Sequence, residues 1–294
     1  MFRYSLKSRQ SKVNIKNFAN PKSKNFFDSL PKFLKAEELK KLIQAIKKAK
    51  KNKKQIVWML GGHTIKCGLS PIFIELMQKG FITHLAMNGS VPIHDFEIAF
   101  IGSTSEDVDE AIKNGTFGMA KETGQIMNQA ITKGLRKKQG YGLILGKLIT
   151  ESKYPYKNLS ILYSAYKLNI PATVHTAIGA EIIYQHPEAN GAGLGQASFI
   201  DFKKFTKSIE KLENGVVLNL GSAVIMPEVF LKALSINRNQ SKENKPKNFT
   251  AANFDMISHY RPLTNILKRP GGKAYDFRGH HEIMIPLLSK ELLK

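Results

Sequence analysis

One pattern recurs along this chain: a short apolar run, then small or polar residues, then a stretch with helical periodicity. Four apolar runs end in this way, at Gly61-Gly62-His63-Thr64, Asn88-Gly89-Ser90, His175-Thr176-Ala177-Ile178-Gly179 and Asn219-Leu220-Gly221-Ser222. Strands that alternate with helices are the signature of parallel α/β winding, in which helices cover both faces of one sheet. The pattern therefore predicts an α/β fold.

Apolar periodicity places the individual elements along the chain. Strands are expected at 56–60, 82–87, 171–175, 216–220, 251–257 and 273–277. Helices are expected at 36–50, 71–80, 92–101, 106–112, 160–168, 198–212, 227–234 and 281–293, with one or two more over 118–150. Residues 237–249 are polar and aperiodic, which predicts a surface loop. The glycines of 191–195 follow no strand, so we expect a mobile loop there instead of a dinucleotide-binding turn.

Basic residues are concentrated near the N-terminus. Residues 1–54 carry 17 Lys and Arg against three acidic residues, in a chain of 294 residues with a net charge of +22. We predict a basic arm and one helix over 1–54, followed by a single α/β domain over 55–294. Lys outnumbers Arg by 38 to 7. Because specific contacts to phosphates and bases favour Arg, any attraction to nucleic acid is expected to be nonspecific.

Cysteine usage and hydropathy exclude several classes of protein. Cys67 is the only cysteine, which rules out a disulfide framework and a thiolate-rich metal site. No His-x-x-x-His pair occurs, and no metal is expected. No apolar run reaches the roughly 18 residues that a membrane span requires, and the N-terminus lacks the apolar stretch of a secretory signal. We expect a soluble, cytoplasmic protein.

The four strand ends are the most informative positions. Ligands of parallel sheets bind at the carboxyl ends of the strands, where small residues admit them and helix N-termini attract phosphate. Four such ends predict a nucleotide site, although glycines also serve simply to make tight turns. His94, Asp95 and Glu97 open the helix after the second strand, where they either cap it or bind an amine or ribose. The same two interpretations apply to Gly279-His280-His281-Glu282.

Segments of this chain, taken in order, resemble the deoxyhypusine synthase family over roughly residues 53–290. Residues 88–98 are similar to the family's Ala-Gly-Gly-Val-x-x-Asp-Leu-Ile segment, with one residue inserted. Residues 160–171 match its Ser-x-x-Tyr-x-Ala-x-x-x-x-Ile-Pro segment, and residues 285–288 look like its closing Phe-Pro-Leu-Leu. The resemblance implies a Rossmann-like fold, NAD bound at the strand ends, and a homo-oligomer, either a dimer or a tetramer.

In that family NAD takes a hydride from spermidine, and a lysine carries the aminobutyl group to a lysine of a translation factor. From the strand ends and this resemblance together, we predict three sets of site residues. The cofactor set is Gly62, His63, Asn88, Gly89, Ser90, Gly179, Gly221 and Ser222. The substrate set is His94, Asp95, Glu97 and Glu181. The catalytic set is Lys268, His281 and Glu282.

The chain also departs from the family. After Gly221 it reads Ser222-Ala223-Val224-Ile225-Met226-Pro227, where the family has its catalytic histidine, and Lys268 lacks the family's Trp-Gly context. We therefore predict a deoxyhypusine synthase-like, NAD-binding transferase or oxidoreductase that acts on an amine or another small molecule. The alternative is a non-catalytic binding module that keeps the fold and uses its basic arm to bind polyanions.

Overall fold

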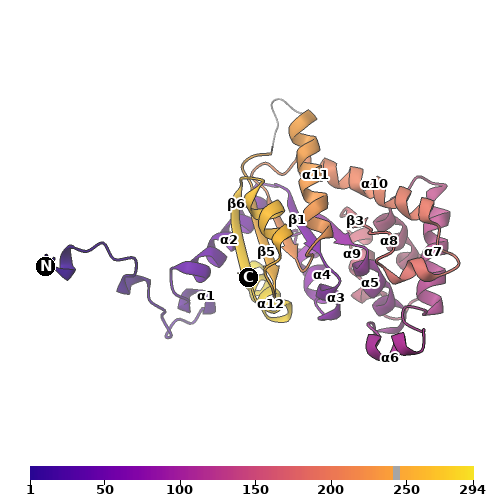
Figure 1. Cartoon of the computed structure of the whole chain (residues 1–294), viewed down its shortest axis with the longest axis horizontal. Coiled ribbons are helices and arrows are strands. Elements are labelled where there is room, and N and C mark those ends of the chain that lie inside the picture. Colours follow the sequence, from indigo (N-terminus) through magenta and orange to yellow (C-terminus); the bar gives the residue numbers. More distant parts are fainter. Residues whose placement is uncertain (241–245) are drawn as a thin grey trace.

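The computed structural model describes residues 1–240 and 246–294 and contains one six-stranded sheet (Figure 1). Its strands are β1 (Ile56–Leu60), β2 (His84–Asn88), β3 (Ala172–His175), β4 (Val216–Leu220), β5 (Thr250–Asp255) and β6 (Lys273–Arg278). All neighbours pair in parallel, in the order β3-β2-β1-β4-β5-β6. This is a Rossmann-like α/β sheet flanked by helices, so the predicted fold class is confirmed.

The strand order reverses between β1 and β4, because the chain winds outward from β1 to β3 and then returns to the centre. In such a sheet the reversal opens a crevice at the carboxyl ends of the two central strands. The two strands are closely joined there: a Cβ added to Gly61 would lie 2.0 Å from the carbonyl oxygen of Gly221. Only glycine permits this contact, so the crevice has a floor of backbone.

Helices cover both faces of the sheet. The longer ones are α2 (Leu34–Lys51), α4 (Ser70–Gln78), α5 (Ser90–Ile101), α7 (Lys121–Leu135), α8 (Tyr141–Glu151), α9 (Ile161–Lys167), α10 (Gly191–Glu210), α11 (Ile225–Gln240) and α12 (His281–Leu292). Short ones are α1 (Phe26–Ser29), α3 (His63–Lys66), α6 (Val108–Lys113), the 3-10 turns η1 (Leu6–Ser8), η2 (Ile15–Asn17), η3 (Lys157–Leu159) and η4 (Ile182–Gln185), and the π-helix η5 (Pro262–Lys268).

Alternate residues of each strand enter two separate cores. Trp58 and Leu60 pack with α2, α4 and α12 on one face, whereas Val57 and Met59 pack with α10 and α11 on the other. All five residues of β1 are buried, as expected for a central parallel strand covered on both sides. Among the described residues, no helix is both long and apolar enough to cross a membrane.

The helix predicted over 36–50 is α2, and its predicted stripe of Leu39, Leu42, Ile43 and Ile46 is buried in the larger core. The N-terminal end of the chain extends away from the body of the molecule (Figure 1), and every residue from 1 to 16 is exposed, whereas Phe27 of α1 is buried in the larger core. The basic arm therefore differs from α2, which packs against the sheet.

Two predicted loops belong in part to helices. The glycines of 191–195 form the first turn of α10, where Asn190 Oδ1 accepts a hydrogen bond of 2.9 Å from the Gly193 amide. The buried side chains of Leu194 and Ala197 hold this turn on the core, which outweighs the low helix propensity of glycine. The prediction of a mobile loop there was wrong. Helix α11 likewise continues to Gln240, and residues 241–245 of the predicted loop lie outside the described residues.

Candidate active site

The carboxyl edge of the sheet brings the four predicted strand ends together. Residues that follow β1, β2 and β3 line one cavity of about 580 Å³ at this edge. Ser90, His94 and Glu97 come from α5, and Glu181 comes from the loop after β3. The far wall of the cavity is formed by residues 100–123, the segment that connects α5 to α7. The cavity thus collects three of the four residues predicted to bind substrate.

Acidic side chains dominate the charged residues of this cavity. Glu97, Glu106, Glu122 and Glu181 line it, against a single lysine, Lys66. The contrast with the rest of the molecule is strong, because the whole chain carries 45 Lys and Arg but only 23 Asp and Glu. The remaining wall is largely apolar, with Ile93, Phe100, Ile101, Val108, Phe117 and Ile182. Such a cavity suits a small ligand with a positive charge and an aliphatic body.

Inside the cavity a hydrogen-bonded chain runs from His94 to Glu97. The Thr104 hydroxyl donates a short hydrogen bond to Glu97 Oε2 and lies 2.8 Å from His94 Nδ1. Because the Thr104 hydroxyl donates its proton to the carboxylate, the Thr104 oxygen can only accept a hydrogen bond from His94 Nδ1. Nδ1 therefore carries the proton of the neutral ring. Glu97 Oε1 accepts a second hydrogen bond, of 3.0 Å, from the Thr123 hydroxyl. Two threonines thus hold Glu97 in place.

This arrangement fixes the tautomer of His94. With the proton on Nδ1, the lone pair of the neutral ring lies on Nε2, for which no described residue serves as a hydrogen-bond partner. Burial, reinforced by the charge of Lys66, lowers the pKa of His94 to about 4. The ring is therefore neutral near pH 7, and its Nε2 can accept a proton from a bound ligand.

Glu181 closes the other side of the cavity. Its carboxylate lies over Gly89, where an added Cβ would be 2.1 Å from Oε1, and the same oxygen accepts a hydrogen bond of 3.1 Å from the Ala177 amide. Oε2 is buried and accepts no hydrogen bond within normal geometry among the described residues. Burial raises the pKa of this carboxyl group, although the Tyr184 hydroxyl lies near enough to the carboxylate to act in the opposite direction. A cation nearby would satisfy Oε2 and favour the ionised form.

The predicted glycines do not all offer bare backbone to a ligand. Ser90 Oγ lies 2.5 Å from a Cβ added to Gly62, and the His281 ring lies 2.9 Å from one added to Gly221. Gly221 also has φ +65°, which favours glycine. Around Gly179 nothing lies within 4 Å. Packing thus explains Gly62, Gly89 and Gly221, and a ligand at this edge would meet side chains at those positions.

Two other residues of the predicted cofactor set use their polar groups within the fold. The Ser222 hydroxyl accepts a hydrogen bond of 3.2 Å from the Met226 amide in the first turn of α11, and Ser222 is 1% exposed. Asn88 Oδ1 accepts a hydrogen bond of 2.8 Å from the Ser90 hydroxyl. These contacts shape the turns after β4 and β2.

Asp95 lies outside the cavity, contrary to its prediction as a substrate-binding residue. It is fully buried and accepts three hydrogen bonds at the start of α9, from the Ser160 hydroxyl (2.6 Å) and the amides of Ile161 (2.8 Å) and Leu162 (3.1 Å). Burial raises its pKa to about 6, although these hydrogen bonds act in the opposite direction. Asp95 therefore joins α5 to α9 and does not line the cavity.

Lys268 is not brought to this edge. It ends η5, the connection that leads from the carboxyl end of β5 back to the start of β6, and its side chain is exposed. Just beyond it, the Pro270 carbonyl accepts a hydrogen bond of 2.7 Å from Arg238, near the end of α11. Lys268 thus lies toward the amino edge of the sheet, across the molecule from the cavity.

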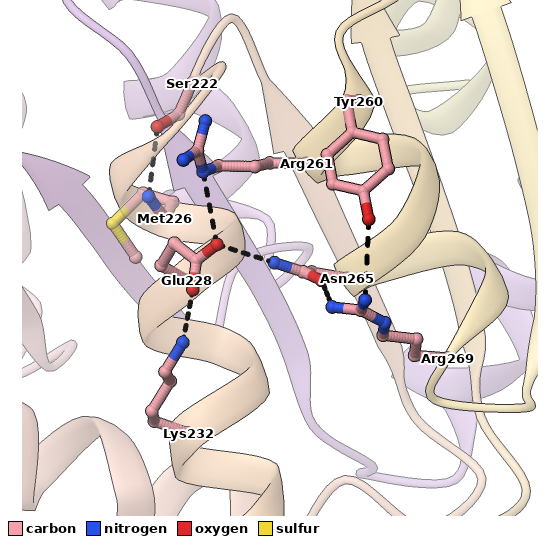
Figure 2. Close-up of polar contacts among 8 residues, drawn as sticks. All are labelled: Ser222, Met226, Glu228, Lys232, Tyr260, Arg261, Asn265 and Arg269. Atoms are coloured by element: carbon pink, nitrogen blue, oxygen red, sulfur yellow. Dashed lines mark hydrogen bonds and ion pairs between the residues drawn. The ribbon is translucent and has the colours of Figure 1, made fainter.

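A polar network explains the position of η5. Glu228 of α11 accepts hydrogen bonds from Arg261 Nε (3.2 Å) and Asn265 Nδ2 (2.8 Å), and Arg269 donates to Asn265 Oδ1 (2.7 Å), as Figure 2 shows. Lys232 pairs with the other oxygen of Glu228. These contacts fix the segment that carries Lys268 against α11.

The remaining predicted residues form a second cluster on the other side of Gly62. The His281 ring is 1% exposed, donates from Nε2 to the Phe254 carbonyl (3.1 Å), and lies 5.5 Å from the His63 ring between centroids. Its Nδ1 is buried and has no partner among the described residues. Glu282 is exposed, and its Oε2 lies 3.6 Å from Cys67 Sγ. Burial and this carboxylate raise the pKa of the Cys67 thiol.

The structure also assigns residues to the cavity that the sequence analysis did not single out. Lys66, Thr104 and Thr123 line it, together with Glu106 and Glu122. Four of these five belong to loops or helix starts between residues 102 and 123, where no strand end or periodicity marks a site.

Together these features define a Rossmann-like α/β protein with a cavity at the carboxyl edge of its sheet that combines four glutamates with an apolar wall. Neither a family profile nor a curated protein matches the sequence. Solved structures share the fold. AgrE, in a ternary complex with ornithine and NAD+, aligns with a TM-score of 0.56 at 13% identity over 87% of this chain. The chain spans about a third (32%) of AgrE, and 31% of ArgZ, an arginine dihydrolase from Cyanobacteria.

Two smaller proteins align over more of their own length. A proposed deoxyhypusine synthase from Entamoeba histolytica gives a TM-score of 0.53 at 12% identity, with 87% of each chain covered. A conserved protein from Methanococcus maripaludis S2, assigned to the LOR/SDH type, gives 0.54 at 16% identity over 89% of this chain and 70% of its own. At these identities the similarity establishes a shared fold, which includes the deoxyhypusine synthase-like type that the sequence resembles.

Proposed function

We propose that this protein is an NAD-dependent enzyme that acts on a small aliphatic amine bound in the cavity at the carboxyl edge. The observation that carries the proposal is the set of four glutamates lining a cavity of about 580 Å³ in a strongly basic chain. Cationic ligands are held by carboxylates in partly desolvated sites, where the attraction exceeds that in water. The apolar wall would contact the carbon chain of the amine.

Glu181 is the residue that we assign to the ammonium group. Its carboxylate lines the cavity and accepts only the Ala177 amide with normal geometry, whereas both oxygens of Glu97 accept hydrogen bonds from threonines. Glu106 Oε1 already accepts a hydrogen bond of 2.8 Å from the Gly118 amide, so Glu106 and Glu122 add negative charge at the outer wall. Glu97 thus positions the Thr104–His94 pair and contributes charge.

His94 is placed to remove a proton from the amine. Its neutral ring presents Nε2 as the basic atom, and Thr104 and Glu97 hold Nδ1 in the manner of the orienting group of a catalytic triad. An amine must lose its proton before the carbon next to it can give up a hydride. The pKa of about 4 leaves Nε2 unprotonated over the whole neutral range, and a base this weak holds the amine proton only briefly before passing it to water.

We assign the dinucleotide to the carboxyl edge beside this cavity. Ser90 and His63 border Gly62, Gly179 has open space around it, and the buried Nδ1 of His281 lacks a partner among the described residues. When bound, NAD+ would supply the hydride acceptor. AgrE, about a third of which aligns with this chain, was solved with NAD+ bound, which supports the proposal.

Amine binding tests the cavity directly. A primary diamine, together with NAD+, is expected to raise the thermal midpoint of the intact protein, because each ligand binds the native state. Glu181→Gln should weaken diamine affinity by about 10- to 100-fold, the value of a hydrogen bond to a charged group, and leave NAD+ binding unchanged. Calorimetric titration of each ligand measures both effects.

The matched control is Glu75→Gln, which neutralises an exposed glutamate of α4 away from the cavity. Equal diamine affinity in the two variants would refute the cavity assignment. A diamine response without any NAD+ response would refute the cofactor half alone.

His94→Gln tests the chemical step. We expect NADH production from a panel of diamines and polyamines to fall by about 10²- to 10⁴-fold, with diamine affinity nearly unchanged, as for loss of a general base. His259→Gln, which removes an exposed histidine after β5, should retain the wild-type rate. If both variants turn over equally, His94 is not the base.

The alternative is a non-catalytic module. The exposed basic arm favours it, because an arm free of the body can contact a polyanion. Diamine binding without turnover under any nucleotide would support this alternative. The homo-oligomer remains a prediction. The exposed apolar side chains of Ile178, Ile257 and Ile283, around the carboxyl edge of the sheet, support it.

A further inference from the structure

We propose that His63, Cys67 and Glu282 form a zinc site beside the crevice, with an open fourth position for water. This inference goes beyond the proposed function, because it assigns a metal ion to a cluster of which only His63 also borders the crevice. One nitrogen of His63, the sulfur of Cys67 and one carboxylate oxygen of Glu282 all lie within 4.8 Å of one another. Imidazole, thiolate and carboxylate are the three ligand types that proteins use for zinc.

Local structure explains why these side chains converge. His63 opens α3 and Cys67 follows its last residue, and the Cys67 amide donates a hydrogen bond of 3.0 Å to the His63 carbonyl. That bond closes one helical turn, which places residues i and i+4 on the same face. Glu282, in the first turn of α12, reaches this face from the opposite side. The pair from α3 therefore offers two ligands from one helical face.

The distances match a tetrahedral ion. With Zn–S of about 2.3 Å and Zn–O of about 2.0 Å, a tetrahedral angle separates sulfur from oxygen by about 3.5 Å. The observed separation between Cys67 Sγ and Glu282 Oε2 is 3.6 Å. Here the Cys67 thiol donates a hydrogen bond to the Glu282 carboxylate, and a Zn²⁺ ion that displaces the thiol proton would be held between the same two atoms.

A second, independent observation lies beside the cluster. The His281 ring is buried next to His63 and gives its Nε2 proton to the Phe254 carbonyl, so its unpartnered Nδ1 is a buried hydrogen-bond acceptor. Metal-bound imidazoles nearly always donate their second N–H to an acceptor, and metal-bound waters need one too. The His281 ring, with its centroid 5.5 Å from that of His63, is the buried polar group beside the site, and its Nδ1 is free to accept a hydrogen bond.

Cobalt and zinc titrations test the site. Cys67 is the only cysteine, so the near-ultraviolet thiolate-to-cobalt charge-transfer absorption can arise from this position alone. The intact protein should bind one equivalent of Co²⁺ with this absorption, and Zn²⁺ should displace it. Cys67→Ser should abolish the absorption and weaken Zn²⁺ binding by more than about 100-fold, the upper range for loss of an outer hydrogen-bond partner.

Glu282→Gln alters an exposed side chain, so it keeps the test valid if the cysteine variant misfolds. It should weaken Zn²⁺ binding, whereas the thiolate-to-cobalt absorption should remain at saturating Co²⁺. His63→Gln should do the same, and His259→Gln, at the same edge but outside the cluster, should bind as the wild type does. Absence of the charge-transfer absorption in the wild type, or Zn²⁺ affinity unchanged in Cys67→Ser and Glu282→Gln, would overturn the proposal. Neither readout involves NAD+ or an amine, so this test is independent of the proposed enzymatic function.

Discussion

Replacing Asp95 with alanine is expected to lower the free energy of unfolding by about 3 kcal/mol or more. The buried carboxylate satisfies the Ser160 hydroxyl and two amides at the start of α9, and its removal leaves all three donors inside the core. Each buried donor without a partner costs about 1–3 kcal/mol. Urea unfolding of the two proteins at pH 7 measures the difference.

Ser160→Ala provides the matched comparison, because it removes one of the three hydrogen bonds and keeps the carboxylate. Its cost should be about 1 kcal/mol, the usual value of an N-cap side chain. Diamine affinity, measured where both variants are folded, should be the same in each. If Asp95→Ala costs no more than Ser160→Ala, or selectively abolishes amine binding, the structural role assigned to Asp95 is wrong.

Replacing His84 with glutamine should make the protein less sensitive to acid. His84 is fully buried between Ser208 Oγ (2.7 Å) and Thr173 Oγ1 (2.9 Å), and burial lowers its pKa to about 3. A histidine with a depressed folded-state pKa stabilises the protein above the unfolded-state value of about 6.5, and that stability is lost as the pH falls. The wild type thus loses about 1.4 kcal/mol per pH unit to this one group below pH 6.5.

The glutamine side chain in the variant does not take up a proton on unfolding. As the pH falls from 7 to 5, the free energy of unfolding of His84→Gln should therefore rise by about 2 kcal/mol relative to that of the wild type. Comparison with a variant is needed because Asp95 and Asp201 act in the opposite direction. Burial raises their pKa values to about 6 and about 7, so their contribution declines as the pH rises from about 4 to 7. His280→Gln alters an exposed histidine and should parallel the wild type. Parallel profiles for His84→Gln would contradict the prediction.

The strands and their polar ends were predictable because each is a local pattern. A short apolar run bounded by small residues identifies a buried parallel strand without knowledge of its neighbours, and the registers of β1, β2 and β4 confirm those runs. The glycine-rich start of α10 was missed for the opposite reason. Tertiary contacts of Leu194 and Ala197 stabilise that turn, and such contacts cannot be predicted from the local helix propensity of the sequence.

Some errors about the site had a signal in the sequence. His94 and Glu97 are three residues apart and share one face of α5, whereas Asp95 is turned about 100° away, toward the core. His63 and Cys67, which are four residues apart, share one helical face for the same reason. Lys268 ends a connection between two parallel strands, which must return the chain to the amino edge. The wall formed by residues 100–123 had no such signal, since its loops meet Glu181 only in the folded chain.

The reversal of strand order at the centre of the sheet also governs how the molecule assembles. Residues 61–215 separate β1 from its neighbour β4, and residues 89–171 separate β2 from β3. Sheets built from such distant pairings form slowly, because chain entropy is lost before the contacts compensate for it. The crevice between Gly61 and Gly221 and the cavity under Glu181 are both bounded by these late pairings. During synthesis on the ribosome, neither ligand site can exist until most of the chain has emerged, so binding competence is among the last properties this protein acquires.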